Sequence, residues 1–419
     1  MAADFLPDAT QETVRQIGQA DLLIGIPSYN DAATIQPLVR NIVVGLATCF
    51  PKSRSVVLLS DAGSQDGTIR LFEQAGHDAS LTLVVQHPVP AVQPMGVPDR
   101  GVPGYENALG AILQASQQLG VRACALIDGS LWSVTGEWVG RLLSPIADRS
   151  FDLVTSVYRR HKYEGTLTNS LLYPITRALY GKRISSPSGG SYGFSSKLVS
   201  TYLIKDLRGG LSAQLALDNW LTTVAVAEGH EVCQASLGTK LQQAKAPAVE
   251  LSVILSQAVG SVFSLMEEYQ SAWEGRSGSS PVPTFGPPQE VATEWAPVNR
   301  GRMVEAFKQG LRDLLPLWEV ILAQDTMAQI LPLGLLDDED FRFPMDIWVQ
   351  AVYDFALAYH HRVIHREHLL RSLTPLYLGR TASFVAETLD GGPEEVRDCI
   401  ERLCEEYETL KTYLVERWR

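Results

Sequence analysis

Three polar segments each follow directly on an apolar run in the first half of the chain. They are Pro27-Ser28-Tyr29-Asn30-Asp31, the segment from Ser60 to Thr68, and Asp128-Gly129-Ser130. Carboxylates, amides and hydroxyls of this kind hydrogen-bond the hydroxyls of a ribose or the edge of a uracil, and a carboxylate also binds a hard cation. The segments therefore predict a site for a polar ligand such as a nucleotide.

The second segment also has a purely structural interpretation. In SDAGSQDGT (60–68), Asp66 or Ser64 could satisfy the free N–H groups at the start of a helix. The residues alone leave both interpretations open. The first apolar run is not followed by G-x-G-x-x-G, and the chain has no G-x-x-x-x-G-K-[ST], so neither a dinucleotide site nor a P-loop is indicated.

Alternating strands and helices must position these segments. Strands are predicted at about 22–28, 55–60, 82–86, 123–128 and 152–157, with helical patterns between them at 31–49, 67–76 and 105–120. Near-continuous Val, Leu and Ile in strands separated by helices are typical of a parallel sheet covered on both faces. The fold class is therefore α/β, and we expect the polar segments at the carboxyl ends of the strands, where such sheets bind ligands.

The rest of the chain has a different pattern. Residues 273–300 are dense in Pro, Gly and Ser and predict a linker, and residues 301–419 read as helices. Trp348, Val352, Phe355 and Tyr359 are spaced to share one helix face, which we interpret as packing core. The predicted organisation is an α/β domain at 1–272, a linker at 273–300 and an all-helical domain at 301–419, which packs beside the acceptor side of the site or forms a homodimer interface.

Composition limits the partners and the compartment. The chain carries 35 Lys and Arg against 47 Asp and Glu, a net charge of −12, which opposes binding to nucleic acid. No apolar run approaches the roughly 20 residues that span a bilayer, and the polar, acidic start does not resemble a signal peptide. The five cysteines are scattered and form no C-x-x-C, so we expect reduced thiols in a cytoplasmic protein.

Four histidines near residue 360 could form a metal site. His360, His361, His365 and His368 are predicted to lie on one helix, where their spacing could hold zinc. The alternative is a solvated helix, which the neighbouring cations Arg362 and Arg366 favour. The acidic run at 337–340 is interpreted as a solvated turn.

Several motifs, in this order along the chain, resemble the GT-A nucleotide-sugar glycosyltransferases. They are IPSYNDAATI (26–35), SDAGSQDGT (60–68), IDGS (127–130) and SGGSYGFS (188–195); YRRHKYEGTLTN (158–169) and LTPLYLGRTASFV (373–385) add to them. The most similar members are the glucosyl-3-phosphoglycerate, mannosyl-3-phosphoglycerate and glucosylglycerate synthases. The resemblance implies a GT-A domain followed by a helical domain. It also implies transfer of a hexose, with retention, from a nucleotide diphosphate to glycerate, phosphoglycerate or a related small acid, with Mg²⁺ or Mn²⁺ on the diphosphate and no organic cofactor.

The resemblance also implies roles for individual residues. Those that fall on nucleotide-binding positions are Pro27, Tyr29, Asn30, Asp61 and Asp128. Those that fall beside the donor sugar, and are assigned to catalysis, are Gly189, Gly190, Tyr192 and Asp218. Arg159 and Arg160 fall in the segment that offers basic groups to the acid of the acceptor, which suits a guanidinium fork.

Three departures from the family pattern concern the metal and the diphosphate. Ser130 stands where the family has the second Asp of Asp-x-Asp, and Gln242 stands where it has a metal-binding His. The family's Gly-Lys-Gly-x-Ala loop is here Gly-Tyr-Glu-Asn-Ala at 104–108. A hard cation prefers carboxylate oxygen, so we expect Asp128 alone to hold a cation weakly.

Two functions follow from these departures. The first is a glycosyltransferase with weakened or metal-independent activity. The second is a catalytically inactive relative, a pseudoenzyme that binds a nucleotide, a sugar or a protein partner as a structural or regulatory subunit. The remaining Asp61, Asp218 and Gly189-Gly190 favour the first.

Overall fold

The computed structural model describes residues 4–76, 81–89, 101–205, 214–243, 250–289, 291–294 and 296–419. The chain forms two compact units that do not follow its order. The first unit comprises 1–159, 186–249 and 282–289, and the second comprises 160–185, 250–281 and 290–419. This division differs from the predicted boundaries at 272 and 300, because two segments from the first 281 residues pack with the C-terminal helices.

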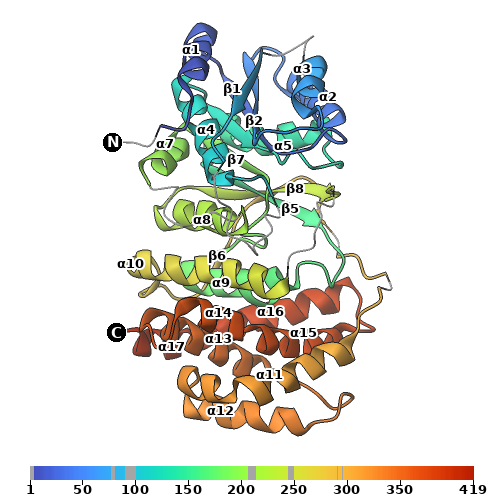
Figure 1. Cartoon of the computed structure of the whole chain (residues 1–419), viewed down its shortest axis with the longest axis vertical. Helices are drawn as coiled ribbons and strands as arrows, with labels where there is room; N and C mark the ends of the chain where they lie inside the picture. Colours follow the sequence, from blue (N-terminus) through green and yellow to red (C-terminus); the bar gives the residue numbers. More distant parts are fainter. Residues whose placement is uncertain are drawn as a thin grey trace. The chain divides into compact units, whose positions relative to one another are not determined.

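The first unit is built on one eight-stranded sheet (Figure 1). Its strand order is β10-β8-β5-β7-β4-β1-β2-β3, and every neighbouring pair is parallel except those of β7 with β4 and β5. All five predicted strands lie in it, so the predicted α/β class with a mainly parallel sheet is confirmed. The strands are β1 (Leu22–Ser28), β2 (Ser55–Asp61), β3 (Leu81–Gln86), β4 (Ala123–Leu126), β5 (Leu153–Arg159), β7 (Tyr192–Ser195), β8 (Val232–Thr239) and β10 (Thr284–Phe285).

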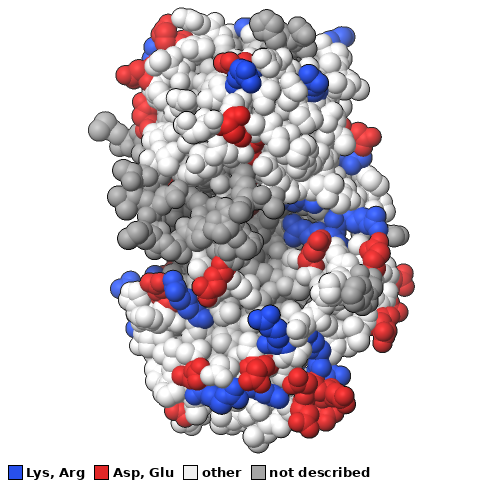
Figure 2. Space-filling model, turned by 45° about the vertical axis from the view of Figure 1, so that its right-hand side comes forward, with Lys and Arg blue, Asp and Glu red and all other residues white. Residues whose placement is uncertain are grey.

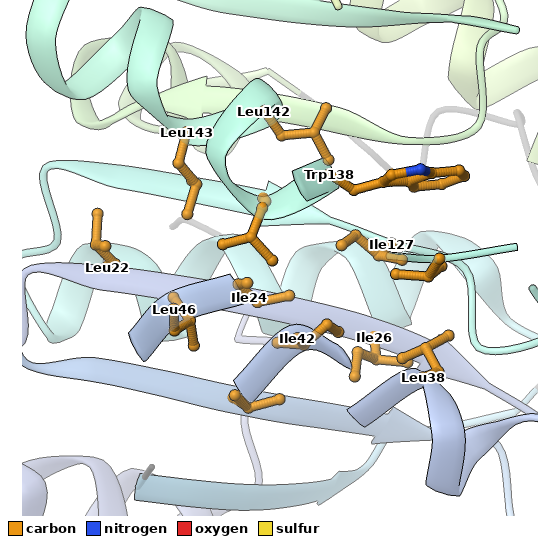
Figure 3. Close-up of a cluster of buried hydrophobic side chains, with 14 of the residues drawn as sticks. Leu22, Ile24, Ile26, Leu38, Ile42, Leu46, Ile127, Trp138, Leu142 and Leu143 are labelled. Atoms are coloured by element: carbon orange, nitrogen blue, oxygen red, sulfur yellow. The ribbon is translucent and has the colours of Figure 1, made fainter. Parts of the chain in front are cut away.

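Helices cover both faces of this sheet. On one face α2 (Ile35–Cys49) packs with α3 (Thr68–Gly76) and α5 (Gly136–Arg149); on the other α4 (Tyr105–Gln118) packs with α1 (Asp8–Ile17), α7 (Ser196–Ile204) and α8 (Gln214–Ala227). Figure 3 shows the alternate β1 residues Leu22, Ile24 and Ile26 pointing into the core between the sheet, α2 and α5. On the opposite face, a Cβ on Gly25 would lie 2.3 Å from Ile112 of α4, so glycine permits this close helix–sheet contact.

Part of the predicted linker belongs to this sheet. Thr284 and Phe285 pair in parallel with Gln234 and Ala235 of β8, and the Phe285 ring contacts Phe151 edge-on. The strand pairing and the packing of this half-buried aromatic fix a segment whose composition predicted irregular structure. Positions 290 and 295 of the predicted linker lie outside the described residues.

The second unit is mainly helical, as predicted for the C-terminal part. Among its described residues the sheet structure is limited to the pairing of β6 (Lys182–Arg183) with β9 (Ser280–Pro281). Trp348, Val352, Phe355 and Tyr359 are buried on α13, which confirms their interpretation as core. The helices are η1 (Thr168–Leu172), α6 (Tyr173–Tyr180), α9 (Leu251–Glu268), α10 (Gln270–Trp273), α11 (Arg300–Ile321), α12 (Gln324–Ile330), η2 (Leu331–Leu335), α13 (Met345–His360), α14 (Arg366–Ser372), α15 (Thr374–Thr388), α16 (Pro393–Thr409) and α17 (Lys411–Trp418).

The prediction that the four histidines share one helix is wrong. Helix α13 ends at His360, Arg362 takes the left-handed conformation with φ +54°, and His365 precedes α14. The chain therefore turns between His361 and His365, which removes their helical spacing. Nowhere in the described part of the chain do three His, Cys, Asp or Glu residues form a group that could hold a metal.

Two further observations concern the surface and length of the elements. Lys and Arg are interspersed with Asp and Glu over the face shown in Figure 2. Within the described ranges, no helix combines the length and the apolar character that crossing a membrane requires.

Candidate functional site

One edge of the sheet brings the polar segments together. Strands β1, β2 and β4 are parallel, with Ser28 paired to Asp61, and the chain after β4 continues along β1 through a hydrogen bond from the Gly129 N–H to the Pro27 carbonyl. Because β7 is antiparallel to β4, with Tyr192 paired to Leu126, its first residues lie at this same edge. The edge therefore carries the ends of β1, β2 and β4 and the Gly189-Gly190 loop before β7.

Asp61 is fully buried and is used by its own loop. Its Oδ1 accepts hydrogen bonds from the backbone N–H groups of Gly63 and Ser64, at 2.8 and 2.7 Å, and its Oδ2 accepts one from the Ser64 hydroxyl. Asp66 accepts from Thr68 and, through Oδ2, from the Ala32 N–H at 2.9 Å. Partial burial opposes the shift, but the hydrogen bonds from Thr68 and Ala32 lower the pKa of Asp66. These two carboxylates shape the β2 loop and tie it to the β1 loop.

Tyr29 and Asn30 lie partly exposed in the β1 loop, and Pro27 is buried in β1. Asn30 adopts φ +52°, its N–H donates to the Ser64 hydroxyl at 2.8 Å, and its Oδ1 accepts from the Gln65 N–H at 3.0 Å. The backbone of Tyr29 donates to Asp31. The loops of β1 and β2 thus hold one another, and Tyr29 and Asn30 are the predicted nucleotide-binding residues that remain accessible.

Asp128, Ser130 and Gln242 form one hydrogen-bonded cluster. The Ser130 hydroxyl donates to Asp128 Oδ1 at 2.6 Å, and Gln242 Nε2 donates to Asp128 Oδ2 at 3.2 Å and to Ser130 Oγ at 2.8 Å. The two loops also pair through their backbones, since the Trp132 N–H donates to the Leu241 carbonyl and the Gln243 N–H to the Ser130 carbonyl. Trp132 is 50% exposed beside this cluster. The structure thus brings together the three residues that the sequence placed at the family's metal site.

Gly129 fits this cluster because it lacks a side chain. A Cβ there would lie 2.9 Å from Asp31 Oδ2 and 3.0 Å from the Pro27 carbonyl oxygen. The carbonyl of Gly129 accepts from the buried Thr34 hydroxyl at 2.7 Å. The segment that carries Asp128 and Ser130 is therefore packed directly on the β1 loop.

The residues at this position do not fit a resident divalent cation. A cation needs free lone pairs on oxygen, whereas the groups around Asp128 are N–H and O–H donors whose hydrogens point at the carboxylate oxygens. Ser130 and Gln242 contribute these donors from the very positions that would have to supply ligands. The donor set therefore disagrees with the metal that the family resemblance implies.

Asp218, from α8, is 4% exposed and lies at the same edge. Burial raises the pKa of the Asp218 carboxyl to about 7; the charge of Lys240 opposes this, and that of Asp128 adds to it. No described group hydrogen-bonds Asp218 Oδ1. Gly190 takes φ +83°, and a Cβ there would lie 3.0 Å from Lys240 Nζ and 3.9 Å from Asp218 Oδ2. Asp218 thus lies beside the cation Lys240 and the backbone of Gly190, which carries no side chain. A carboxyl that changes charge near neutral pH in such a place can accept a proton from a hydroxyl or hydrogen-bond a sugar hydroxyl.

Tyr192 and Tyr105 complete the surroundings of Asp218. The hydroxyl of the fully buried Tyr192 points to the Asp218 carbonyl oxygen at 3.5 Å. Burial raises the pKa of Tyr105 well above its usual value, and the Asp218 and Asp128 charges raise it further. Tyr105 and Gln214, which donates to Asp128 at 3.3 Å, were not identified from the sequence as site residues. The only signal for Tyr105 was the departure from the Gly-Lys-Gly-x-Ala loop.

The two predicted acceptor-binding arginines belong to different units. Arg159 is the exposed last residue of β5 in the first unit, and its backbone pairs with Thr239. Arg160 begins a segment of the second unit, where its guanidinium lies against Gly165. Of the two arginines, only Arg159 is held by the fold of the first unit at the edge of the sheet where the candidate site lies.

Residues 189–193 also have the spacing Gly-x-Ser-x-Gly, which elsewhere marks a nucleophilic serine. That motif requires a strand followed by a tight turn and a helix. Here Ser191 is fully buried and leads into strand β7. The segment is therefore a loop of the sheet edge and not a nucleophile elbow.

Comparison with known proteins gives fold-level likeness only. No family model matches the chain, and no curated protein matches it. The solved structures similar to it include glucosyl-3-phosphoglycerate synthase from Mycobacterium tuberculosis, an enzyme of the group that the motifs resemble. Its complex with Mg²⁺ and uridine diphosphate is 19% identical over 61% of this chain and 83% of that chain, with a TM-score of 0.45. Its complex with Mn²⁺, uridine diphosphate and glucosyl-3-phosphoglycerate is 19% identical over 63% and 85%, with a TM-score of 0.44.

Proposed function

We propose that this chain is a glycosyltransferase that moves a hexose, with retention, from a nucleoside diphosphate sugar to glycerate, phosphoglycerate or a related small acid. The observation that carries the proposal is the buried Asp218, whose carboxyl changes charge near neutral pH beside Lys240 and Gly190. Buried polar atoms are normally hydrogen-bonded, so the buried Asp218 Oδ1, which no described group hydrogen-bonds, favours a ligand that brings its own hydroxyl groups. A hexose is such a ligand.

The neighbouring loops suit the nucleotide of the donor. Tyr29 and Asn30 offer an aromatic ring and an amide at the end of β1, and Asp61 and Asp66 act as positioning residues that fix this loop. Gly190 in the left-handed conformation lets a ligand approach the backbone near Asp218. Arg159, exposed at the end of β5, suits the carboxylate or phosphate of the acceptor. For Arg160 the same role rests on the family resemblance.

The direct test is an assay of sugar transfer. The protein is incubated with uridine or guanosine diphosphate hexoses and with glycerate or phosphoglycerate, and glycoside products are measured by mass spectrometry. We expect one donor and acceptor pair to give a glycoside, and we expect Asp218→Asn to lower its rate by about tenfold or more, because it removes a charge-assisted hydrogen bond. If the wild-type protein binds a nucleotide but transfers sugar from none of these donors, the result would contradict the proposed enzyme activity and favour the second candidate.

The second candidate is a nucleotide- or sugar-binding subunit without catalysis. The observation that favours it is the closure of Asp128 by Ser130 and Gln242, since this carboxylate no longer offers free lone pairs to a catalytic cation. Calorimetric binding of a nucleoside diphosphate together with absent turnover of every donor would support it.

A further inference from the structure

We propose, on the basis of the proposed donor site, that this chain binds the diphosphate without a divalent cation: the Asp128–Ser130–Gln242 cluster fills the cation's place, and the Lys240 ammonium supplies the positive charge.

The lone pairs of Asp128 are all used by donors inside the protein. An ionised carboxylate has about four acceptor positions. Oδ1 accepts from the N–H and the hydroxyl of Ser130, at 2.9 and 2.6 Å, and Oδ2 accepts from the amides of Gln242 and Gln214, at 3.2 and 3.3 Å. Every acceptor position is therefore used by a donor within the protein. A cation could bind only after displacing one of them.

Gln242 turns its amide nitrogen, which is a donor, toward Asp128 and Ser130. Asp128 can only accept, so the group of Gln242 that faces it must be the amide nitrogen. The Ser130 hydroxyl donates its single hydrogen to Asp128, so toward Gln242 it can only accept, and it accepts from Gln242 Nε2. The partners thus hold Gln242 with its donor group toward the cluster, which is the opposite of what a metal ligand requires.

Backbone pairing between two loops holds the cluster in place. The loop that carries Ser130 and the loop that carries Gln242 are joined by a bridge between Leu131 and Gln242, and the Leu241 N–H also donates to the Ser133 hydroxyl at 3.0 Å. Rotating Gln242 to present its oxygen would break its bonds to both Asp128 and Ser130 inside a paired backbone. The closed arrangement is therefore built into the fold of these loops.

Lys240 provides a positive charge close to this cluster and to Asp218. A diphosphate leaving group needs positive charge, and a fixed side-chain cation can supply it. Lys240 lies two residues before Gln242, its Nζ approaches the Gly190 backbone, and it lies 5.3 Å from the centroid of the buried Tyr158 ring. The charge of Lys240 lowers the pKa of Asp218, so the ammonium lies close to that carboxyl. It therefore lies where the proposed function puts the donor sugar. A lysine binds phosphate as a point charge.

The test measures binding of uridine and guanosine diphosphate by calorimetry in EDTA and in Mg²⁺ or Mn²⁺. We expect one of them to bind wild type with affinities that agree within about threefold in the two conditions. Lys240→Met should weaken binding by about tenfold or more, Lys240→Arg should retain most of it, and Lys52→Met, at an exposed lysine between α2 and β2, should change nothing. Wild-type binding that disappears in EDTA and returns with Mn²⁺ overturns the inference and leaves the proposed function standing. Absence of binding in both conditions overturns the proposed function as well.

A gain-of-function variant tests the cluster itself. Electron paramagnetic resonance of Mn²⁺ with protein alone should show no bound ion for wild type and a bound ion for Ser130→Asp combined with Gln242→His, because carboxylate and imidazole ligands return. Gln242→Glu introduces a side chain of nearly the same size as the native one. It is the variant to measure if circular dichroism shows that the double variant is poorly folded. It should also bind Mn²⁺, since two carboxylates then face each other. Tight Mn²⁺ binding by wild type would overturn the proposal.

Discussion

The hydroxyl of Ser64 links the backbone of Asn30 to the carboxylate of Asp61, accepting a hydrogen bond of 2.8 Å from the Asn30 N–H and donating to Asp61 Oδ2. One hydroxyl therefore holds the loops after β1 and β2 together. Ser64→Ala should lower the free energy of unfolding by about 1–2 kcal/mol, since it leaves two buried or half-buried groups without this partner. Equilibrium urea denaturation of wild type and of Ser64→Ala measures this difference in the free energy of unfolding.

The same variant tests whether the paired loops serve the nucleotide. Because Ser64 acts on Asn30 and not on the ligand, Ser64→Ala should weaken nucleoside diphosphate binding by about three- to tenfold, as measured by calorimetry. Thr48→Ala, on the exposed side of α2, is the control and should bind like wild type. Equal binding by both variants would mean that the nucleotide does not depend on the Asn30 loop.

Asp218 predicts a particular dependence of stability on pH. Burial raises the pKa of its carboxyl to about 7 in the folded state, so folding favours the protonated form. The favourable contribution is complete below the unfolded pKa of about 4 and is lost as pH rises toward 7. Between pH 5 and pH 8, wild type should lose roughly 2–3 kcal/mol relative to Asp218→Asn, at about 1.4 kcal/mol per unit. Urea denaturation of both proteins at the two pH values checks this, and parallel pH curves would contradict the assignment.

Gly129 should tolerate no side chain. In Gly129→Ala the new Cβ would press on the Pro27 carbonyl and the Asp31 carboxylate, neither of which can move without disturbing the β1 loop. We expect a loss of about 1–3 kcal/mol in the free energy of unfolding, measured by chemical denaturation. Gly275→Ala is the matched control, since a Cβ there meets nothing within 4 Å. A Gly129→Ala protein as stable as this control would show that the loop is less tightly packed than described.

In the second unit, Arg177 is fully buried and binds Glu401 through two hydrogen bonds of 2.6 and 2.8 Å. It also binds Glu408 at 2.7 Å, so α6 is joined to α16 by a buried cation. The side chains of Glu401 and Glu408 are 40% and 19% exposed, so water partly compensates their charges when the cation is removed. Arg177→Met should therefore cost roughly 1–2 kcal/mol of unfolding free energy. Arg397→Met removes an exposed ion pair with Glu394 and should change the free energy of unfolding by less than about 1 kcal/mol. Similar thermal and urea midpoints for the two variants would refute a structural role for Arg177.

The strands that the sequence predicted are those with strong local signals. β1 and β2 are uninterrupted apolar runs followed by turn residues, and a parallel sheet requires nothing more of them. The sequence does not predict β7 as a strand, and its residues stand out only in the motif SGGSYGFS (188–195), because these four residues gain their strand form from β4 and β5 on either side. β10 was hidden in the Pro-rich segment, because its pairing partner β8 is distant in sequence.

The candidate site divides in the same way. The meeting of the segments at 27–31, 60–68 and 128–130 follows from strand direction, which local patterns reveal. The hydrogen bond from Gln214 to Asp128, and the place of Tyr105 within reach of the Asp128 and Asp218 charges, depend on how α4 and α8 pack, and no local pattern encodes that. The division of Arg159 from Arg160 depends on where the chain leaves one unit for the other, and adjacent residues of one type give no sign of it.

The exposed indole of Trp132 gives the protein an intrinsic optical probe. It is 50% exposed, whereas the other tryptophans in the described ranges are at most 4% exposed. Its backbone is fixed to Leu241, next to Lys240 and Gln242, so any ligand that settles beside this loop changes the solvent around the ring. Emission from a solvated indole is shifted to the red of emission from buried ones, and water-soluble quenchers reach it selectively. Among the tryptophans that the structure describes, Trp132 is therefore the one whose emission on the red side of the spectrum reports occupancy of this edge, in the presence or absence of any metal ion.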